Sequence, residues 1–259
     1  MAPDLSATFE QLYADHQAKV YRLAMGLAGN ADDAEEITQE AFYRAFRSYQ
    51  NFRGVSSFFT WIYRITLNVA HDYLKQRTKM PREVLTEDLG LPLAAIVDLN
   101  PGSDPEAEVL AREVRLRCLH CLTECLPMQQ RQVFCLAITL GLPQKLVAEI
   151  LECSPGAVKT ILYRAKQRWI GYMENRCQLI KKTNPCNCRQ WIRFAKAQGW
   201  ISAQTARSLR PPLAGAKEEI LKMGTIRDLY QELYNDRADT AFVARIRDGI
   251  RNKEWAIFS

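Results

Sequence analysis

Long apolar stretches are missing from this sequence. No run reaches the ~18 consecutive apolar residues that a membrane-spanning helix needs. The N-terminal segment MAPDLSATFEQLY also lacks the basic and then apolar pattern of a secretion signal. Internal repeats and low-complexity segments are absent. These features predict a protein of the cytoplasm without membrane insertion, whose 259 residues suffice for two or three small domains.

Histidine is scarce, and the common phosphate-binding and zinc-protease motifs are missing. The three histidines, His16, His71 and His120, stand far apart, and the sequence contains no HExxH or ATP-type motif. We assign no catalytic residue, and these absences argue against a zinc-dependent enzyme. One enzymatic alternative stays open, because three C-terminal thiolates and a water molecule would suffice as ligands of a catalytic zinc ion.

The overall charge makes nucleic acid a compatible partner. The net charge is +6 and the isoelectric point about 8.9, and such an excess attracts phosphate without proving that the chain binds it. The sequence also has 8 cysteines. Because the cytoplasm keeps thiols reduced, this number argues against a disulfide framework and for reduced thiols or a metal site.

Apolar residues recur at helical spacing through most of the chain, which predicts an all-α fold. The segment 58–75 carries two stripes. The first is apolar and must pack on another element: Phe58, Ile62, Ile65, Val69 and Tyr73. The second mixes an indole ring with polar and charged groups: Trp61, Arg64, Asn68, His71, Asp72 and Lys75. Such groups can stack on bases and hold phosphates. The alternative is an amphipathic helix whose polar face is simply solvated, which has the same spacing.

Further helices are predicted on both sides of this segment. Residues 6–28 and 34–49 precede it, and 106–125, 128–140 and 144–151 follow after a proline-rich linker. Another helix begins after Ser154 and Pro155, which suit a helix cap and a first helical turn. This helix and the one at 144–151 form a helix-turn-helix pattern, for which a packing hairpin is the alternative. C-terminal helices are expected at 203–208, 217–234 and 238–252.

Three cysteines cluster after the helix-turn-helix. Cys177, Cys186 and Cys188 have a spacing that suits Zn²⁺ or another soft cation, but a four-ligand site needs one more donor. The remaining five are predicted to be buried structural thiols, since free cysteine is often a core residue: Cys118, Cys121, Cys125, Cys135 and Cys153.

Two segments resemble the bacterial RNA polymerase sigma factors of the extracytoplasmic-function (ECF) group. The first, DDAEEITQEAFYRAFRSYQNFRGVSSFFTWIYRITLNVAHDYLKQR, is similar to that family's promoter-melting domain. The second, LPMQQRQVFCLAITLGLPQKLVAEILECSPGAVKTILYRAKQRW, is similar to its helix-turn-helix domain. The resemblance implies a melting domain at 5–77, a flexible linker at 78–105, a helix-turn-helix domain at 106–174 and a helical extension at 175–259.

The resemblance also implies how the chain would act. It would bind the β′ clamp and β flap of core RNA polymerase, read promoter DNA at two elements, and require no cofactor. It would direct an enzyme without being one. The residues that match polymerase contacts are Gln39, Glu40, Tyr43 and Arg44. Those expected at the opened −10 element, beside the loop 54–57, are Ser56, Trp61, Arg64, Asn68 and Lys75. Those expected at the −35 element are Ser154, Lys159, Thr160, Tyr163 and Arg164.

The extension at 175–259 resembles the cysteine-containing tails of some metal-responsive members. The resemblance implies a regulatory segment that docks on the sigma body and changes promoter binding according to metal or thiol state. The thiols for either role, with zinc or another soft metal ion as the ligand in the first, are Cys177, Cys186 and Cys188. The sequence does not decide whether the extension inhibits or activates, or whether a separate anti-sigma factor binds the chain.

The helix-turn-helix departs from the family pattern at two places. Gln144, Lys145 and Leu146 stand where the family usually has a tyrosine and two acids, and Ala157 replaces a usual threonine. These changes leave the preferred DNA sequence undetermined. They do not alter the expected way in which the helix-turn-helix docks on DNA. A DNA-binding regulator that never meets polymerase is the main alternative, and it gives no account of residues 52–75 or of Gln39 and Glu40.

Overall fold

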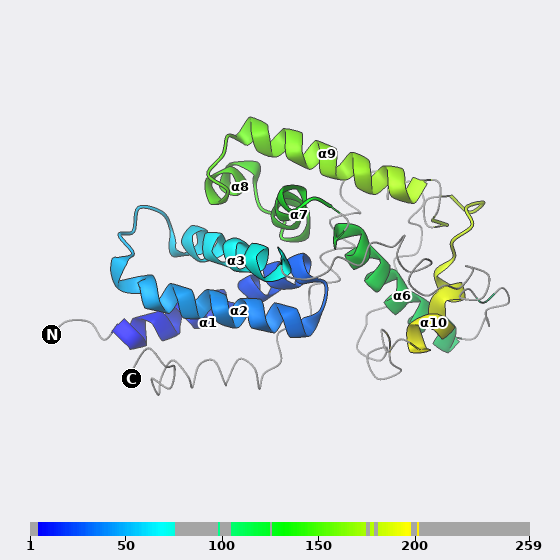
Figure 1. Cartoon of the computed structure of the whole chain (residues 1–259), viewed down its shortest axis with the longest axis horizontal. Helices are drawn as coiled ribbons and strands as arrows, with labels where there is room; N and C mark the ends of the chain where they lie inside the picture. The colour runs from blue at the N-terminus through cyan, green and yellow to red at the C-terminus, as the bar shows by residue number, and fades with distance from the viewer. Residues whose placement is uncertain are drawn as a thin grey trace. The chain divides into compact units, whose positions relative to one another are not determined.

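The computed structural model describes residues 5–75, 98, 105–124, 126–174, 177–178, 181–197 and 201 (Figure 1). Within them the fold is all-α, as predicted: no β-strand occurs, and one isolated bridge joins Cys177 to Cys186. No helix in this part of the chain is long and apolar enough to cross a membrane. The helices expected at 203–208, 217–234 and 238–252 lie outside the described residues.

The chain divides into two compact units. The first holds the described residues of 1–77 and 128–163, and the second holds those of 78–127 and 164–229. Three helices begin the first unit: α1 spans Leu5–Ala28, α2 spans Ala31–Ser48 and α3 spans Phe58–Lys75, with a 3-10 turn at Tyr49–Asn51. Each of these helices packs on the other two.

Aromatic and aliphatic side chains fill the core between these three helices. The Phe9 ring lies edge-on to its neighbours, with its centroid 5.0 Å from that of Phe46 and 6.1 Å from that of Phe58. Ring quadrupoles favour this geometry over face-to-face stacking. The largest fully buried side chains of the three helices are Phe9, Tyr13, Leu23, Leu27, Ile37, Phe42, Ile62 and Tyr63.

The buried face of α3 is wider than its predicted apolar stripe. Ile65 and Tyr73 of that stripe are only half-buried. The face also includes Thr60, Tyr63, Thr66, Leu67 and Ala70. The reason is that α3 contacts three helices, α1, α2 and α8, rather than a single neighbour.

A polar junction ties the end of α3 to the start of α2. The Asn30 side-chain oxygen accepts from the Asp33 backbone N–H at 2.9 Å, and its Nδ2 donates to Asp33 Oδ2 at 2.7 Å. The Tyr73 hydroxyl donates to Asp33 Oδ1 at 3.1 Å. Asp33 is 2% exposed, so these donors replace the water that its carboxylate lost on burial.

The first unit continues with the helix-turn-helix segment. It contains α7 (Met128–Phe134), a π-helix (Cys135–Thr139), α8 (Gln144–Ile150) and the first residues of α9 (Pro155–Glu174). The prediction of one regular helix at 128–140 was wrong in its second half, where the π-helix replaces it. The π-helix lies close to Gly26 of α1: a Cβ atom placed on Gly26 would be 3.2 Å from Cys135 Sγ.

Arg131 strengthens the packing of α7 on α1. The residue is 5% exposed, and its Nη1 donates to the backbone oxygen of Leu27 at 3.1 Å. Carbonyl oxygens in the last turn of a helix have no partner within the helix. Arg131 therefore caps the C-terminal end of α1 from a position far along the chain.

The second unit is built on α6 (Pro105–Glu124), which carries a 3-10 helix at Cys188–Trp191 and α10 (Ile192–Ala197). Leu110, Val114, Ala195 and Ile201 are buried together, and Cys188, Trp191 and Ile192 pack against them. Most of the predicted linker lies outside the described residues. Two of its residues are seen: Asp98, whose N–H donates to the Gln190 oxygen at 2.9 Å, and Pro105, which begins α6.

Candidate nucleic-acid interface

The loop before α3 presents an apolar side chain to solvent. Gly54 has a φ of 66°, a left-handed conformation that glycine adopts without steric cost, and the next residue, Val55, is 93% exposed. The loop ends at Ser57, whose Oγ accepts from the Thr60 N–H at 3.1 Å. Ser56 is half-buried. The turn thus projects a valine that the described core does not use.

Trp61 is held firmly at the start of α3. Its ring centroid lies 4.8 Å from that of Phe52 and 5.6 Å from that of Phe58. The residue is half-buried, so packing fixes the indole while part of it stays at the surface. This placement accommodates both the predicted stacking role and a role in packing.

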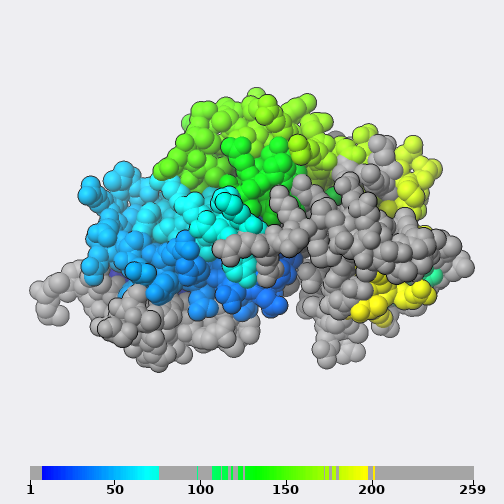
Figure 2. Space-filling view, viewed as in Figure 1, coloured from blue at the N-terminus to red at the C-terminus, as the bar shows by residue number. Residues whose placement is uncertain are grey.

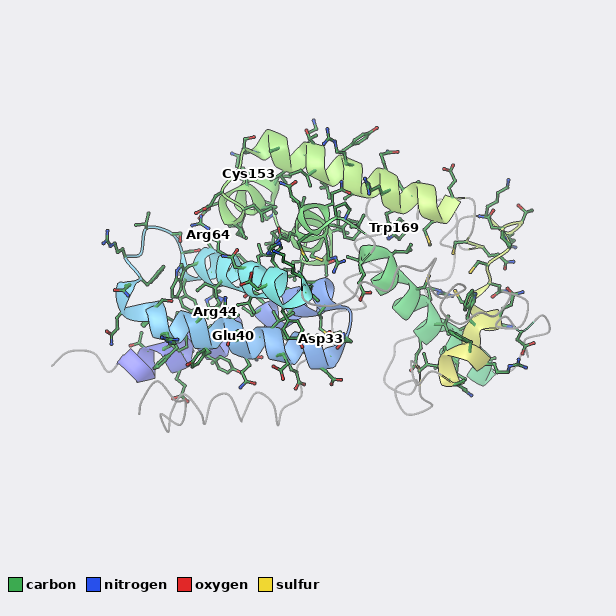
Figure 3. The ribbon with its side chains drawn as sticks, in the orientation of Figure 1. Asp33, Glu40, Arg44, Arg64, Cys153 and Trp169 are labelled. Atoms are coloured by element: carbon green, nitrogen blue, oxygen red, sulfur yellow. The ribbon has the colours of Figure 1, made fainter. Side chains whose placement is uncertain are left out.

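Arg64 is the residue of the polar stripe with the most contacts outside α3. Its guanidinium lies against the C-terminal end of α8 (Figure 3). There Nη2 donates to the backbone oxygen of Glu149 at 2.7 Å, and Nε donates to the backbone oxygen of Ile150 at 3.2 Å. Nη1 also pairs with Glu152 Oε1 at 2.9 Å. We expected this side chain to hold DNA phosphate, and in this structure it caps a protein helix.

A second contact runs beside the first. The Thr60 hydroxyl, on a fully buried residue, donates to Glu149 Oε1 at 3.0 Å. Glu152 follows in the turn between α8 and α9 with a φ of 53°, a left-handed conformation that is uncommon for a residue with a Cβ. We call these bonds from Thr60 and Arg64 to residues 149–152 the α3–α8 contact. It lies wholly within the first unit.

The remaining predicted −10 residues line the open side of α3. Asn68 and Lys75 are exposed, as are His71 and Asp72. Lys75 is the last described residue of α3, where a cation also interacts favourably with the helix dipole. The open side therefore offers an amide and a cation to a ligand.

The predicted polymerase-binding residues share one face of α2. Gln39 is exposed and Tyr43 half-buried, with the Arg47 guanidinium 5.8 Å from the Tyr43 ring centroid. Arg44 Nε donates to Glu40 Oε1 at 2.6 Å, and Nη1 reaches Asp72 of α3 at 3.4 Å (Figure 3). The hydrogen bond that Arg44 donates to the Glu40 carboxylate is the main reason that the pKa of Arg44 is raised. Both side chains are over 40% exposed, so the pair orders this face more than it stabilises the fold.

The predicted −35 residues lie on the exposed side of α9, whose surface is in view in Figure 2. Ser154 caps the helix, since its Oγ accepts from the Ala157 N–H at 3.1 Å. Tyr163 is 63% exposed although it is a large aromatic residue. Lys159, Thr160 and Arg164 are exposed as well. The opposite side of α9 is buried and apolar, through Val158, Leu162, Ala165, Trp169 and Met173.

The chain matches two family models in sequence order. Residues 12–80 match Sigma-70 region 2, and residues 116–168 match Sigma-70 region 4. An ECF RNA polymerase sigma-E factor from Haemophilus influenzae is 32% identical over 176 residues, a match that covers 66% of this chain and 87% of the relative. This chain belongs to the ECF sigma factors.

Two further similar proteins match about the same part of this chain. The ECF sigma factor SigE of Mycolicibacterium smegmatis is 33% identical over 167 residues, or 64% of this chain and 62% of that protein. A solved structure of the sigma factor RpoE of Bartonella quintana, in complex with the anti-sigma factor NepR, has 23% identity and a TM-score of 0.45. It covers 64% of this chain and 97% of the other.

The sigma factor's cysteines lie in two kinds of surroundings. Cys135 is fully buried, and burial raises the pKa of its thiol to about 12, in agreement with the predicted structural role. Cys118 and Cys153 are only half-buried, so the prediction that both are core thiols was wrong. The side chains of Cys121 and Cys125 lie outside the described part of the chain.

The Cys188 thiol is influenced electrostatically by other cysteines of the second unit. Burial raises the pKa of the Cys188 thiol to about 12, with further raising contributions from Cys118, Cys177 and Cys186 and a lowering one from Arg115. Cys177 is buried, and Cys186 and Cys188 are half-buried. As the described side chains stand, no three His, Cys, Asp or Glu residues are grouped so that they could hold one metal ion.

Sequence reasoning missed the α3–α8 contact of this sigma factor. Thr60 belongs to neither of the two predicted stripes, and Glu149 and Glu152 were not singled out in the sequence. No local signal identifies such partners, because the contact depends on how two segments 85 or more residues apart pack together. Val55 was detectable, since a valine directly after Gly54 in a polar loop has no neighbouring apolar residue to join.

Proposed function

We propose that this sigma factor binds core RNA polymerase and directs it to specific promoters. The observation that carries the proposal is the order of parts in one chain: a region 2 match with an exposed polar face on α2, followed by a region 4 match with an exposed face on α9. Gln39, Glu40, Tyr43 and Arg44 would dock on the β′ clamp, and region 4 would meet the β flap.

The −10 element would be opened and read by the loop 54–57 and α3. Flipping a base out of the stack costs a few kcal/mol, and stacking on an aromatic ring returns about 1–3 kcal/mol per base. Trp61 is held rigidly enough to serve as such a platform. Asn68 and Lys75 are exposed for base-edge and phosphate contacts.

The −35 element would lie against the first turns of α9. Helix-turn-helix proteins place the N-terminal part of the second helix against base edges in the major groove. Lys159, Thr160 and Tyr163 are exposed there, while Arg164 is a cation for the flanking phosphates. Ser154 already uses its oxygen as a helix cap, so a contact to DNA would have to share it.

Promoter reading would begin with the separation of α8 from α3. The α3–α8 contact occupies the Arg64 guanidinium with two carbonyl oxygens and one carboxylate. DNA phosphate and the end of α8 are alternative partners for the same donors. We therefore propose that the arrangement described here precedes −10 binding, and that polymerase or DNA must displace α8.

Sigma factors are transcription initiation factors, and we propose that this one acts in the cytoplasm and catalyses no reaction of its own. A DNA-binding regulator independent of polymerase is not favoured, since it leaves the region 2 match at 12–80 without a use. The residues of 175–259 would add regulation that responds to metal or thiol state.

Transcription with purified core polymerase tests the proposal. The full-length chain should bind core polymerase and start transcripts from a subset of a promoter library. Gln39→Arg should weaken the binding of polymerase without changing the folded structure, because Gln39 is exposed. Ala14→Arg, at an exposed position of α1, is the matched control. If the wild-type chain does not associate with core polymerase, the proposal is wrong.

A further inference from the structure

The positive charge of this chain is concentrated at the start of the C-terminal extension. Residues 175–217 contain nine lysines and arginines and no aspartate or glutamate. The whole chain has a net charge of only +6. The excess therefore comes entirely from this segment, and the remaining residues together carry a small negative charge. Such a composition suits a surface that lies against phosphates.

The described part of this segment has a fixed place on α6. Asn187 caps the 3-10 helix at Cys188–Trp191: its Oδ1 accepts from the Arg189 N–H at 3.0 Å, and its own N–H donates to Gln190 Oε1 at 3.2 Å. Arg189 donates from Nε to Glu108 Oε2 of α6 at 3.1 Å. The residues that follow are therefore presented from an ordered base.

The next helix, α10, buries one side and leaves two cations at the surface. Ala195 is 2% exposed and belongs to the same buried cluster as Leu110 of α6, and Ile192 packs against that cluster. Arg193 and Lys196 are exposed. Because they are three positions apart, they are neighbours on the helix surface. We call these two residues the α10 surface.

Two aromatic residues of the same segment serve as its anchors. Trp191 packs against the buried cluster, and its ring meets that of Phe194 edge-on, with the centroids 6.1 Å apart and the planes at 81°. Both residues are half-buried. Proteins that bind single strands present aromatic faces on which bases stack. Since these rings are engaged with protein, the α10 surface is better suited to phosphates than to unpaired bases.

The cations of this surface are not neutralised by neighbouring acids. On the face of α2, Arg44 pairs with both Glu40 and Asp72. Among the described cations of 175–217, by contrast, ion pairs to described residues reach Arg189 alone, through Glu108. The α10 surface therefore offers a guanidinium and an ammonium group to an external anion without first having to break an ion pair of the described chain.

We propose that the α10 surface binds the sugar–phosphate backbone of duplex DNA, whatever the base sequence. Each cation that neutralises a phosphate releases condensed counterions, which is the main source of affinity in contacts of this kind. The contact is additional to those proposed at the −10 and −35 elements, and it does not require polymerase. The tail would thus raise the affinity of the sigma factor for DNA in general.

Binding of the full-length protein to a random-sequence duplex of about 30 base pairs, without polymerase, tests the proposal. Fluorescence anisotropy over a series of potassium chloride concentrations gives the affinity and the slope of log K against log salt. Arg193→Ala with Lys196→Ala should lower this slope by about 2 and weaken binding at low salt about tenfold, because two phosphate contacts are lost. Helical circular dichroism should stay unchanged, since both positions are exposed.

Two further variants are the controls. Lys181→Ala with Lys182→Ala removes the same charge from exposed positions of the loop 177–186 and should keep the wild-type slope. Arg193→Lys with Lys196→Arg preserves the charge of the α10 surface and should bind like wild type.

The proposal is wrong if the wild-type protein does not bind the duplex, or if Arg193→Ala with Lys196→Ala leaves the slope unchanged. An equal loss in the loop variant would show a diffuse effect of net charge instead of a contact at α10. Tighter binding of the same sequence as a single strand, lost in the α10 variant, would assign the surface to unpaired bases. Since polymerase is absent throughout, failure here is distinguishable from failure of the proposed sigma activity.

Discussion

Arg64 of α3 donates a 2.7 Å hydrogen bond to the backbone oxygen of Glu149, in the last turn of α8. A cationic fork at the C-terminal end of a helix satisfies carbonyl oxygens that have no partner within the helix and interacts favourably with the helix dipole. The same fork is suited to phosphate. If α3 reads the −10 element as proposed, Arg64 would connect the position of α8 to the availability of that face.

Weakening the α8 side of this contact should increase −10 binding. Glu149→Gln with Glu152→Gln removes the Arg64 ion pair and weakens the Thr60 hydrogen bond. Glu152 is 71% exposed, so a gain of only about two- to fivefold in affinity for a single-stranded −10 oligonucleotide is expected. Fluorescence anisotropy measures it. Glu36→Gln with Glu174→Gln makes the same charge change at exposed positions, and an equal gain there would contradict the prediction.

Asp33→Ala should lower the free energy of unfolding by about 1–3 kcal/mol. The substitution leaves the Tyr73 hydroxyl and the Asn30 amide without their buried acceptor. Urea denaturation followed by circular dichroism measures the change. Asp32→Ala, at the exposed neighbouring position, removes a charge from the same helix terminus and should cost less than about 1 kcal/mol. Equal losses for both variants would argue against the junction.

Val55→Ser should reduce promoter opening and leave stability unchanged within about 0.5 kcal/mol. The side chain is 93% exposed and contributes little to the core. Permanganate footprinting of the −10 element, with polymerase present, measures opening, and urea denaturation measures stability. Opening at the wild-type level would remove the loop residue from the proposed interface.

Lys159→Ala should weaken the binding of −35 duplex DNA and reduce its salt dependence. If the ammonium group neutralises one phosphate, the slope of log K against log salt should fall by about 1. Binding measured over a series of potassium chloride concentrations gives this slope. Lys181→Ala, at an exposed position in the tail, should leave it unchanged. An unaltered slope for Lys159→Ala would place this residue away from phosphate.

His16 should make the first unit less stable on the acid side of neutrality. Burial, with help from Lys19, lowers the pKa of this imidazole below its usual 6.5. The unfolded chain then binds a proton more readily than the folded one, so stability is present above pH 6.5 and is lost as the pH falls towards the folded pKa. His16→Gln should reduce the change of the free energy of unfolding with pH between pH 8 and 5.5, as measured by urea denaturation. A slope identical to wild type would exclude the histidine as its source.

The helices were predictable because their apolar spacing and caps are local. Ser154 and Pro155 marked the start of α9, and the pattern through residues 58–75 marked α3. The π-helix at Cys135–Thr139 was not predictable, because the apolar spacing of these residues fits a regular α-helix equally well; in the structure this segment lies close to Gly26. The α3–α8 contact escaped because it is a property of tertiary packing.

The candidate sites were only partly predictable. Exposure of Asn68, Lys159 and Tyr163 follows from helical periodicity, so their availability could be expected from the sequence. Their roles stay predictions. Spacing identified the tail thiols, but it could not show that Cys188 packs beside Val114 of α6, because that contact depends on how the tail folds back.

The contact between Arg131 and Leu27 can form only late in synthesis of the chain on the ribosome. These residues are 104 positions apart, and chains are made from the N-terminus at about 5–20 residues per second. For several seconds the last turn of α1 and the surface beside Gly26 therefore exist without the segment that covers them. Nascent chains of this sigma factor should be most exposed to chaperones and proteases during that interval, before α7 has left the ribosome.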